Sequence, residues 1–187
     1  MSAIDPASPP RRLERTRRLF FALWPDDGLR AALAGQVRAL VPDGVGRPQQ
    51  PAQLHLTVEF LGPVPESRLG AVCAAADSVR AASCEVLLDR VAYWRRCSVL
   101  CLLASETPPA LVALVEDLRS ALRARDLEAD PRPYRAHLTL ARKVRGPVRL
   151  APPVPVRWPV TGFALVESRT DPAGSIYTVL QSWQAGD

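Results

Sequence analysis

The two histidines of this chain stand in the segments QLHLTVEFLG (residues 53–62) and RPYRAHLTLAR (residues 132–142). In both segments, leucine and then threonine follow the histidine. The chain has seven threonines among its 187 residues, so a threonine two places after both histidines would arise by chance about once in seven hundred such chains. The shared triplet therefore indicates that the two segments are related.

The similarity extends beyond the triplets, because sliding the chain over itself by 82 positions aligns a whole unit. An apolar run, a segment with helical spacing and a histidine segment follow one another in both copies: residues 19–24, 28–41 and 53–62 in the first, and residues 98–105, 107–127 and 132–142 in the second. Self-similarity at a fixed offset is typical of repeated structural units. The sequence therefore predicts a duplicated strand–helix–strand unit.

The segments outside the repeat predict one more helix and further strands. Residues 65–82 have the apolar spacing of an amphipathic helix, and residues 84–94 read as a strand. Near the C-terminus, residues 163–169 and 175–183 alternate on either side of TDPAG, which has the residues of a turn. The chain is therefore expected to combine paired strands with amphipathic helices.

The positive charge of the chain is concentrated near its N-terminus. Residues 1–18 hold five arginines against two acidic residues, so they carry +3 of the formal net charge of +5. Their three prolines and few apolar side chains predict a disordered basic leader, which is either simply solvated or weakly attracted to polyanions. Residues 19–187 are expected to form a single folded domain. The basic balance therefore does not by itself indicate a nucleic-acid partner.

Several classes of protein and of site are disfavoured. No apolar run approaches the ~20 residues that cross a bilayer, and the N-terminus has charges where a signal peptide has an apolar core. We therefore expect a cytoplasmic monomer with no membrane partner. The four cysteines, Cys73, Cys84, Cys97 and Cys101, lack the spacing of a zinc or redox motif and are expected to be reduced thiols. Two histidines without a third ligand make a poor metal site, so neither a metal nor a cofactor is expected.

The spacing of each triplet places its histidine and threonine on one face of a strand. Side chains two positions apart point to the same side, about 7 Å from each other. His55 therefore lies with Thr57, and His137 lies with Thr139. A pseudo-twofold axis would turn both pairs toward one cleft. Two imidazoles suit in-line attack on a phosphodiester, one as general base and the other as general acid, and hydroxyl groups can donate to the phosphate oxygens.

The two triplets, together with RLFFALWP (residues 18–25) and FALVESRTDPAGSIYTVLQSW (residues 163–183), are similar to the motifs of the 2H phosphoesterase superfamily. Within it, the chain resembles the RNA 2′,3′-cyclic phosphodiesterases, also called the 2′-5′ RNA ligase family. The resemblance implies a bilobal α+β fold, with an antiparallel sheet and outer helices in each lobe and a central groove between the lobes. It also implies metal-independent hydrolysis of a terminal RNA 2′,3′-cyclic phosphate to a 2′-phosphomonoester, with weak 2′-5′ ligation as the reverse reaction.

The resemblance also assigns roles to five side chains. His55 corresponds to the general acid and His137 to the general base that activates water. Thr57 and Thr139 match the positions that contact the phosphate. Arg142 matches an arginine expected near the phosphate, although an odd-numbered step from Thr139 along an ideal strand points it to the opposite face. A bulge or twist would be needed for this contact.

The expected partners are RNA ends or small nucleotides that carry a 2′,3′-cyclic phosphate. Aromatic side chains that would either stack on an unpaired base or pack in the core are Phe60, Tyr93, Trp94 and Tyr134. Arginines that would either rim the groove or serve as solvated charge are Arg95, Arg96, Arg132, Arg135 and Arg145. Two alternatives stay open: a nucleotide- or phosphate-binding module without catalysis, and a phosphodiesterase for another cyclic or 2′-5′-linked nucleotide.

Overall fold

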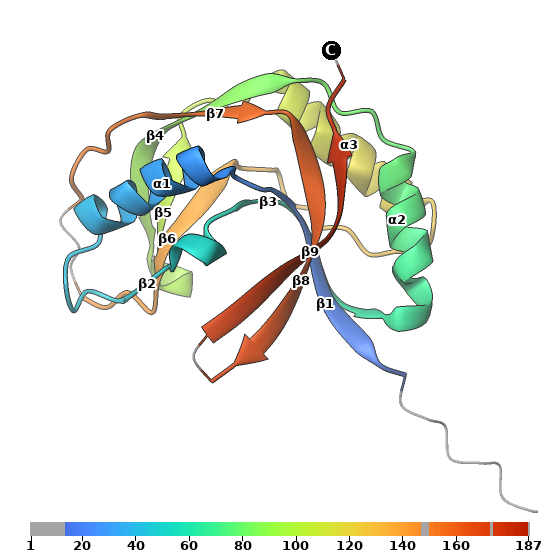
Figure 1. Ribbon diagram of the computed structural model, residues 1–187, viewed down its shortest axis with the longest axis horizontal. Helices are drawn as coiled ribbons and strands as arrows, with labels where there is room; N and C mark the ends of the chain where they lie inside the picture. Colours follow the sequence, from blue (N-terminus) through green and yellow to red (C-terminus); the bar gives the residue numbers. More distant parts are fainter. Residues whose placement is uncertain (1–13, 147–149, 173, 187) are drawn as a thin grey trace, which may run out of the picture.

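The computed structural model describes residues 14–146, 150–172 and 174–186. The strands of these residues form one curled sheet whose ladders are all antiparallel (Figure 1). The strand order is β7-β4-β5-β6-β3-β1-β8-β9, and the short β2 pairs with β6. The strands are β1 (Thr16–Leu23), β2 (Arg47–Pro48), β3 (Leu56–Pro65), β4 (Cys84–Trp94), β5 (Val99–Ala104), β6 (His137–Arg142), β7 (Val156–Val160), β8 (Gly162–Asp171) and β9 (Gly174–Gln184).

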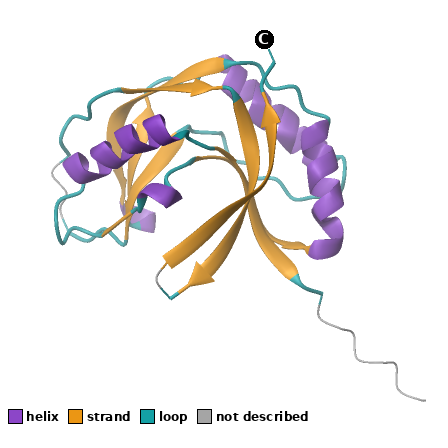
Figure 2. Cartoon of the chain, viewed as in Figure 1, coloured by secondary structure: helices purple, strands orange, loops and turns teal. Residues whose placement is uncertain are grey.

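Three α-helices lie on the outside of the curled sheet (Figure 2). They are α1 (Asp27–Leu40), α2 (Leu69–Asp77) and α3 (Pro109–Arg123), and the short 3₁₀ helices are η1 (Pro51–Gln53), η2 (Glu66–Arg68) and η3 (Arg95–Cys97). The helix predicted over residues 65–82 is shorter than expected, because β3 continues to Pro65 and a 3₁₀ turn follows it. Among the helices of the described ranges, none has the length and apolar character needed to cross a membrane.

The sheet consists of two halves that meet where β3 lies beside β6. In this contact Leu56 is the Cα partner of Leu138. The half β3-β1-β8-β9 is covered by α2 and α3, and the half β7-β4-β5-β6 is covered by α1 (Figure 1). The predicted α+β fold, with antiparallel strands and outer helices in each lobe, is thus confirmed. The two lobes share one continuous sheet.

The structure contains the duplication that the sequence predicts. The helix of the first copy begins at Asp27, and the helix of the second begins 82 positions later at Pro109. Each copy pairs its first strand with its histidine strand, β1 with β3 and β5 with β6. The helix of each copy, however, packs against the other half, because α1 contacts β6 and α3 contacts β3. Each half of the fold therefore depends on the other to cover its core.

The start of the folded domain differs from the sequence-based expectation. β1 begins at Thr16, so residues 16–18 of the predicted leader belong to the sheet, while residues 1–13 lie outside the described residues. The reason is that β3 continues to Pro65 and offers backbone partners to this stretch. Arg17 also forms ion pairs with two glutamates of neighbouring elements, with nitrogen–oxygen distances of 3.4 and 3.6 Å.

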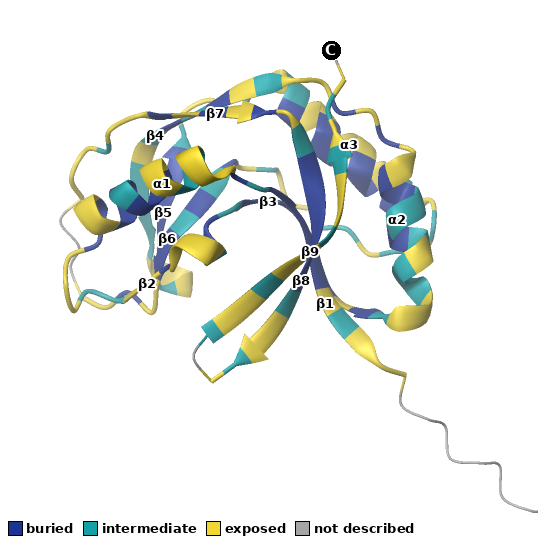
Figure 3. Cartoon of the chain, viewed as in Figure 1, coloured by how far each residue is buried: buried dark blue, intermediate teal, exposed yellow. Residues whose placement is uncertain are grey.

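The core lies between the sheet and its helices. Figure 3 shows buried residues along the strands and exposed residues on the outer sides of the helices. We call the face of the sheet that is turned away from the helices the inner face. It carries two small apolar clusters: Phe20, Ala22, Ala164 and Val166 on one half, and Val99, Cys101 and Leu103 on the other. The histidine triplets lie between these clusters.

Candidate active site

The four polar side chains of the two triplets gather around the contact between β3 and β6. The central leucines of the triplets are Cα partners in an antiparallel register, and both are fully buried. Extending this register by one residue in each direction places His55 opposite Thr139 and Thr57 opposite His137. Opposed side chains in such a pair have Cβ atoms about 4.5–5.5 Å apart. The structure thus brings the two triplets together on the inner face.

Each histidine ring is held by the backbone carbonyl two residues before it. Nδ1 of His55 lies 2.7 Å from the carbonyl oxygen of Gln53, and Nδ1 of His137 lies 2.8 Å from that of Arg135. Because a carbonyl oxygen can only accept a hydrogen bond, Nδ1 carries the proton in both rings. Nε2 is therefore the nitrogen that can take up or give a proton, and the two rings are oriented in the same way relative to their strands.

Aromatic rings pack against both imidazoles. The ring of His55 lies 4.8, 6.0 and 5.1 Å, centroid to centroid, from Phe20, Trp24 and Tyr177. The ring of His137 lies 4.7 Å from that of Trp94. Packing of this kind locks the rotamers of functional side chains. Since three rings surround His55 and one flanks His137, the His55 side of the centre is the more enclosed.

Burial lowers the pKa of both histidines. For His55, burial is the main cause, and the positive charges of Arg142 and His137 add to it; together they outweigh the hydrogen bond to Gln53 and bring the pKa to about 4. The pKa of His137 is also lowered, first by burial and then by Arg142, against the hydrogen bond to Arg135. Both rings are therefore neutral at pH 7 in the free protein. The charge of His137 lowers the pKa of His55 because the two rings lie close together.

A β-bulge in β6 turns Arg142 toward the inner face. The register of β6 with β5 shifts between Leu100 and Cys101, which leaves Leu140 as an extra residue. A bulge of one residue breaks the alternation of a strand, so Arg142 follows onto the side of Thr139 instead of the opposite one. The burial pattern of the strand changes at the same point, and the charge of Arg142 lowers the pKa of both histidines. The bulge that this arginine requires is therefore present.

The strand of the first triplet has a bulge at the equivalent position. The register of β3 with β1 leaves Val58 as the extra residue, 82 positions before Leu140. As a result, Glu59 turns to the buried side and Phe60 turns to the inner face, where it is 45% exposed. Phe60 and Arg142 therefore occupy equivalent places in the two copies of the repeat.

A cavity of about 640 Å³ opens beside Thr57 and His137. Its walls come from β3, from the end of β4, from α3 and from the loop 130–135 that precedes β6. His55, Thr139 and Arg142 are not among its lining residues, so the cavity lies on one side of the histidine centre. Because His137 is the histidine that faces this cavity, a ligand or water molecule in the cavity reaches His137 first.

The residues predicted to stack on a base or to rim the groove fall into two groups. Those that line the cavity are Phe60, Trp94, Tyr134, Arg132 and Arg135. Those that lie outside it are Tyr93, Arg95, Arg96 and Arg145. Tyr93 packs against the main core, and its hydroxyl donates to the carbonyl oxygen of Val144 at 3.0 Å.

All four cysteines are free thiols. Burial raises the pKa of Cys101 to about 12, so this residue behaves as an apolar side chain beside Thr139, its partner across the strands. Across the parts of the chain that the structure describes, no three His, Cys, Asp or Glu side chains gather as metal ligands would.

Sequence reasoning missed three side chains around the histidine centre. Tyr177, on β9, contacts His55 only because β8 brings β9 into the sheet beside β1. Glu59 and Arg119 form a buried ion pair at the edge of the cavity. The alternation of residues 55–60 would have placed Glu59 on the face of His55. The local sequence contains no signal for the bulge that turns it away.

The chain is similar to one family of known proteins along most of its length. The sequence model described as the 2′-5′ RNA ligase superfamily matches residues 25–172. The RNA 2′,3′-cyclic phosphodiesterase of Thermus thermophilus is 32% identical over 177 residues, which cover 89% of this chain and 89% of that protein. The RNA 2′,3′-cyclic phosphodiesterase of Escherichia coli is 30% identical over 173 residues, which cover 91% of this chain and 98% of that protein.

Solved structures share the fold as well. The crystal structure of Escherichia coli LigT with 3′-AMP has a TM-score of 0.85 and 29% identity, and the match covers 92% of this chain and 99% of that one. Other crystal structures of LigT are complexes with ATP, NADP⁺ or phosphate. The similarity therefore includes both halves of the sheet.

Proposed function

Because the chain belongs to the 2′-5′ RNA ligase superfamily, we propose that it hydrolyses RNA 2′,3′-cyclic phosphates to 2′-phosphomonoesters by two-histidine acid–base catalysis. The observation that carries this proposal is the meeting of His55 and His137 on one face, each with Nδ1 bound to a carbonyl and Nε2 available. The names of the two relatives support a cyclic phosphate as the substrate. In 2′-5′ joining of RNA ends, a 5′-hydroxyl would take the place of water as the nucleophile on the cyclic phosphate, and the same two histidines would move the protons.

In the proposed reaction, His137 is the general base and His55 is the general acid. Nε2 of His137 takes a proton from a water molecule, whose oxygen attacks the phosphorus atom in line with O3′. The P–O3′ bond breaks, Nε2–H of His55 gives its proton to O3′, and the phosphate stays on O2′. The contact of His137 with the cavity supports its role beside water, and the enclosure of His55 supports its role at the leaving oxygen.

Three further side chains are proposed to hold the phosphate. The hydroxyls of Thr57 and Thr139 donate to its non-bridging oxygens, and the guanidinium of Arg142 neutralises the charge that grows on them. The anionic phosphate also accounts for the protonation of His55, whose pKa is about 4 in the free protein. A negative charge between the two rings favours their protonated forms and raises that pKa.

The proposed reaction is tested with an oligoribonucleotide that ends in a 2′,3′-cyclic phosphate. We expect a product with a 2′-phosphate and a free 3′-hydroxyl, identified by ³¹P NMR, and the same turnover rate with and without EDTA. A 3′-phosphate product would contradict the assignment of His55 to O3′. Tight binding of the oligonucleotide without product would instead support a binding module.

Phe60 is proposed to stack on the base next to the cyclic phosphate. Its ring lines the cavity, is 45% exposed, and has the guanidinium of Arg18 at 4.7 Å from its centroid. Stacking of a base on an aromatic side chain contributes about 1–3 kcal/mol. We therefore expect Phe60→Leu to raise KM for a 2′,3′-cyclic mononucleotide about tenfold, with kcat within about twofold of the wild-type value. The matched control is Val112→Ala on the exposed side of α3, which should change neither constant; an unchanged KM in Phe60→Leu would rule out the stacking role.

A further inference from the structure

The two histidine strands touch each other over a very short length. In the described residues, β3 and β6 share the single Cα pair formed by Leu56 and Leu138. By contrast, β1 and β3 share eight such pairs. One pair of residues cannot fix both the angle and the separation of two strands. Other contacts must therefore hold the triplets in their relative positions.

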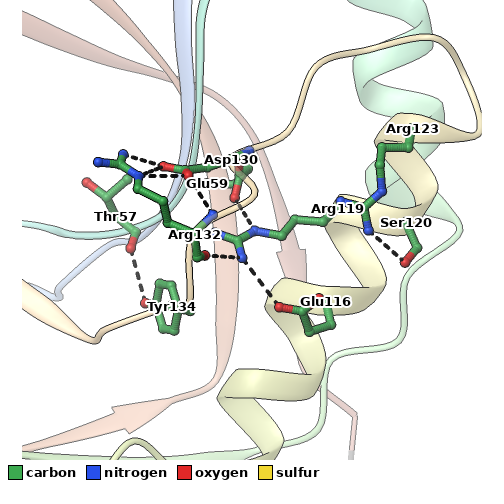
Figure 4. Close-up of polar contacts among 9 residues, drawn as sticks. All are labelled: Thr57, Glu59, Glu116, Arg119, Ser120, Arg123, Asp130, Arg132 and Tyr134. Atoms are coloured by element: carbon green, nitrogen blue, oxygen red, sulfur yellow. Dashed lines mark hydrogen bonds and ion pairs between the residues drawn. The ribbon is translucent and has the colours of Figure 1, made fainter.

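A buried ion pair lies behind the first triplet (Figure 4). Glu59 stands on β3, and its side chain has no exposed surface; Arg119 stands on α3, and its side chain is 6% exposed. Nε of Arg119 donates to Oε2 of Glu59 at 2.7 Å. Because α3 belongs to the second copy of the repeat and β3 to the first, this ion pair joins the two copies.

The same two side chains also bind the loop that leads into β6. The backbone N–H of Asp130 donates to Oε1 of Glu59 at 2.6 Å, and Nη1 of Arg119 donates to the carbonyl oxygen of Arg132 at 2.9 Å. Both oxygens of the carboxylate and two nitrogens of the guanidinium are thus in use. The loop that they hold ends at His137.

Tyr134 adds a third connection between this loop and the first triplet. Its hydroxyl donates to the carbonyl oxygen of Thr57 at 3.1 Å. Figure 4 shows Tyr134, Arg132 and Asp130 along the loop, with Thr57 and Glu59 on the strand beside it. Two of these bonds join β3 directly to the loop, from Glu59 to Asp130 and from Thr57 to Tyr134, and Arg119 joins the loop to β3 through its ion pair with Glu59.

We propose that Glu59 and Arg119 are positioning residues that set the separation of His55 and His137 by holding the loop 130–135 against β3. This inference rests on the proposed function and identifies what fixes the geometry of its two catalytic groups. A buried ion pair is often no more stabilising than apolar side chains of similar volume. What apolar side chains cannot replace is the pair's hold on two backbone groups of the loop. A misplacement of about 1 Å can lower a rate about 100-fold.

The direct test is the double variant Glu59→Leu/Arg119→Met. Replacing both partners leaves no unpaired buried charge, so the variant is expected to fold, with cooperative thermal unfolding and the far-UV circular dichroism of the wild type. Its kcat on the cyclic-phosphate oligonucleotide should fall about 100-fold, while KM stays within about threefold. A folded double variant with the wild-type kcat would overturn the inference.

Two further variants separate positioning from the charge of Arg119 alone. Glu116 is the exposed ion-pair partner of Arg119, and its Oε1 lies 3.3 Å from Nη1 of that arginine. Glu116→Gln removes this charge without changing a contact to the loop. The kcat of this variant should stay within about twofold of the wild type. Tyr134→Phe removes one neutral connection to the loop and should lower kcat about fivefold. A large loss in Glu116→Gln would point to the charge of Arg119 instead of its hold on the loop.

A measurement without turnover tests the same inference. Burial lowers the pKa of His137 in the wild-type protein, so release of the loop should admit water and move that pKa back toward 6.5 in an NMR titration of the imidazoles. If the wild-type protein hydrolyses no cyclic phosphate, the proposed function falls, while this titration still decides on positioning. If the pKa of His137 is unchanged in the double variant, and unfolded protein accounts for any loss of kcat, then Glu59 and Arg119 contribute to stability and not to positioning.

Discussion

Replacing either histidine with glutamine is expected to lower kcat/KM for a 2′,3′-cyclic phosphate by about 1,000- to 10,000-fold, near the upper end of what a positioned acid or base contributes. Glutamine fills a similar volume and can still form hydrogen bonds, but it cannot exchange a proton near neutral pH. His55→Gln and His137→Gln should therefore keep the fold and lose the chemistry. The loss is measured with saturating and limiting substrate, so that kcat and KM separate.

The double variant His55→Gln/His137→Gln tests the same expectation further. If His55 and His137 act on one substrate as a unit, removing both should cost little more than removing one, because the effects of such groups are not additive. Inorganic phosphate should still bind each single variant within about threefold of the wild-type affinity, since Thr57, Thr139 and Arg142 remain in place. Retention of more than a tenth of the wild-type turnover by either variant would show that its histidine is not a proton donor or acceptor in the reaction.

The optimum of kcat/KM is expected to lie on the acid side of pH 6.5. The proposed reaction needs one neutral and one protonated imidazole, and in the free protein both pKa values are lowered, that of His55 to about 4. Above the higher apparent pKa of the pair, the singly protonated form declines about tenfold per pH unit. The profile of kcat should lie at higher pH, because the bound phosphate favours the protonated rings.

This profile is measured from pH 4 to 9 with a 2′,3′-cyclic mononucleotide. The stability of the fold must be followed over the same pH range. The pKa of His55 is about 4 in the folded state and about 6.5 in the unfolded state. Its contribution to stability is therefore complete above pH 6.5 and is lost as the pH falls toward 4. Arg142→Gln provides a second check. Removing this positive charge should shift the pH optimum of the variant to a higher value. An optimum above pH 7 in the wild-type protein would contradict the assigned protonation states.

The duplication and the pairing of each histidine with a threonine could be predicted from the sequence, because each depends on local periodicity or on a fixed offset. The α+β class was predicted from the resemblance of the motifs to a known family. Residue spacing alone could not place Arg142 or Glu59. Both are turned by bulges, and a bulge is a property of the register between two strands. The partner strand that sets this register lies elsewhere in the chain.

The support of the histidines depends on contacts that are remote in sequence. The partner of Glu59 is on α3, 60 positions away, and it lies there because the helices of the two copies have exchanged places. A pattern within one segment carries no information about such an exchange. The duplicated segments predict which elements exist, and the packing between copies decides which side chains meet.

The bulges at Val58 and Leu140 affect how the proposed site could distinguish the two directions in which an RNA strand can enter it. Two identical copies facing each other would present the same surface to a strand entering in either polarity. Here the residue two positions past each bulge is an aromatic ring in one copy, Phe60, and a cation in the other, Arg142. This difference is one of those that break the symmetry inherited from the duplication. In the proposed function it would give a bound nucleotide one side for its base, at Phe60, and another for its phosphate, at Arg142.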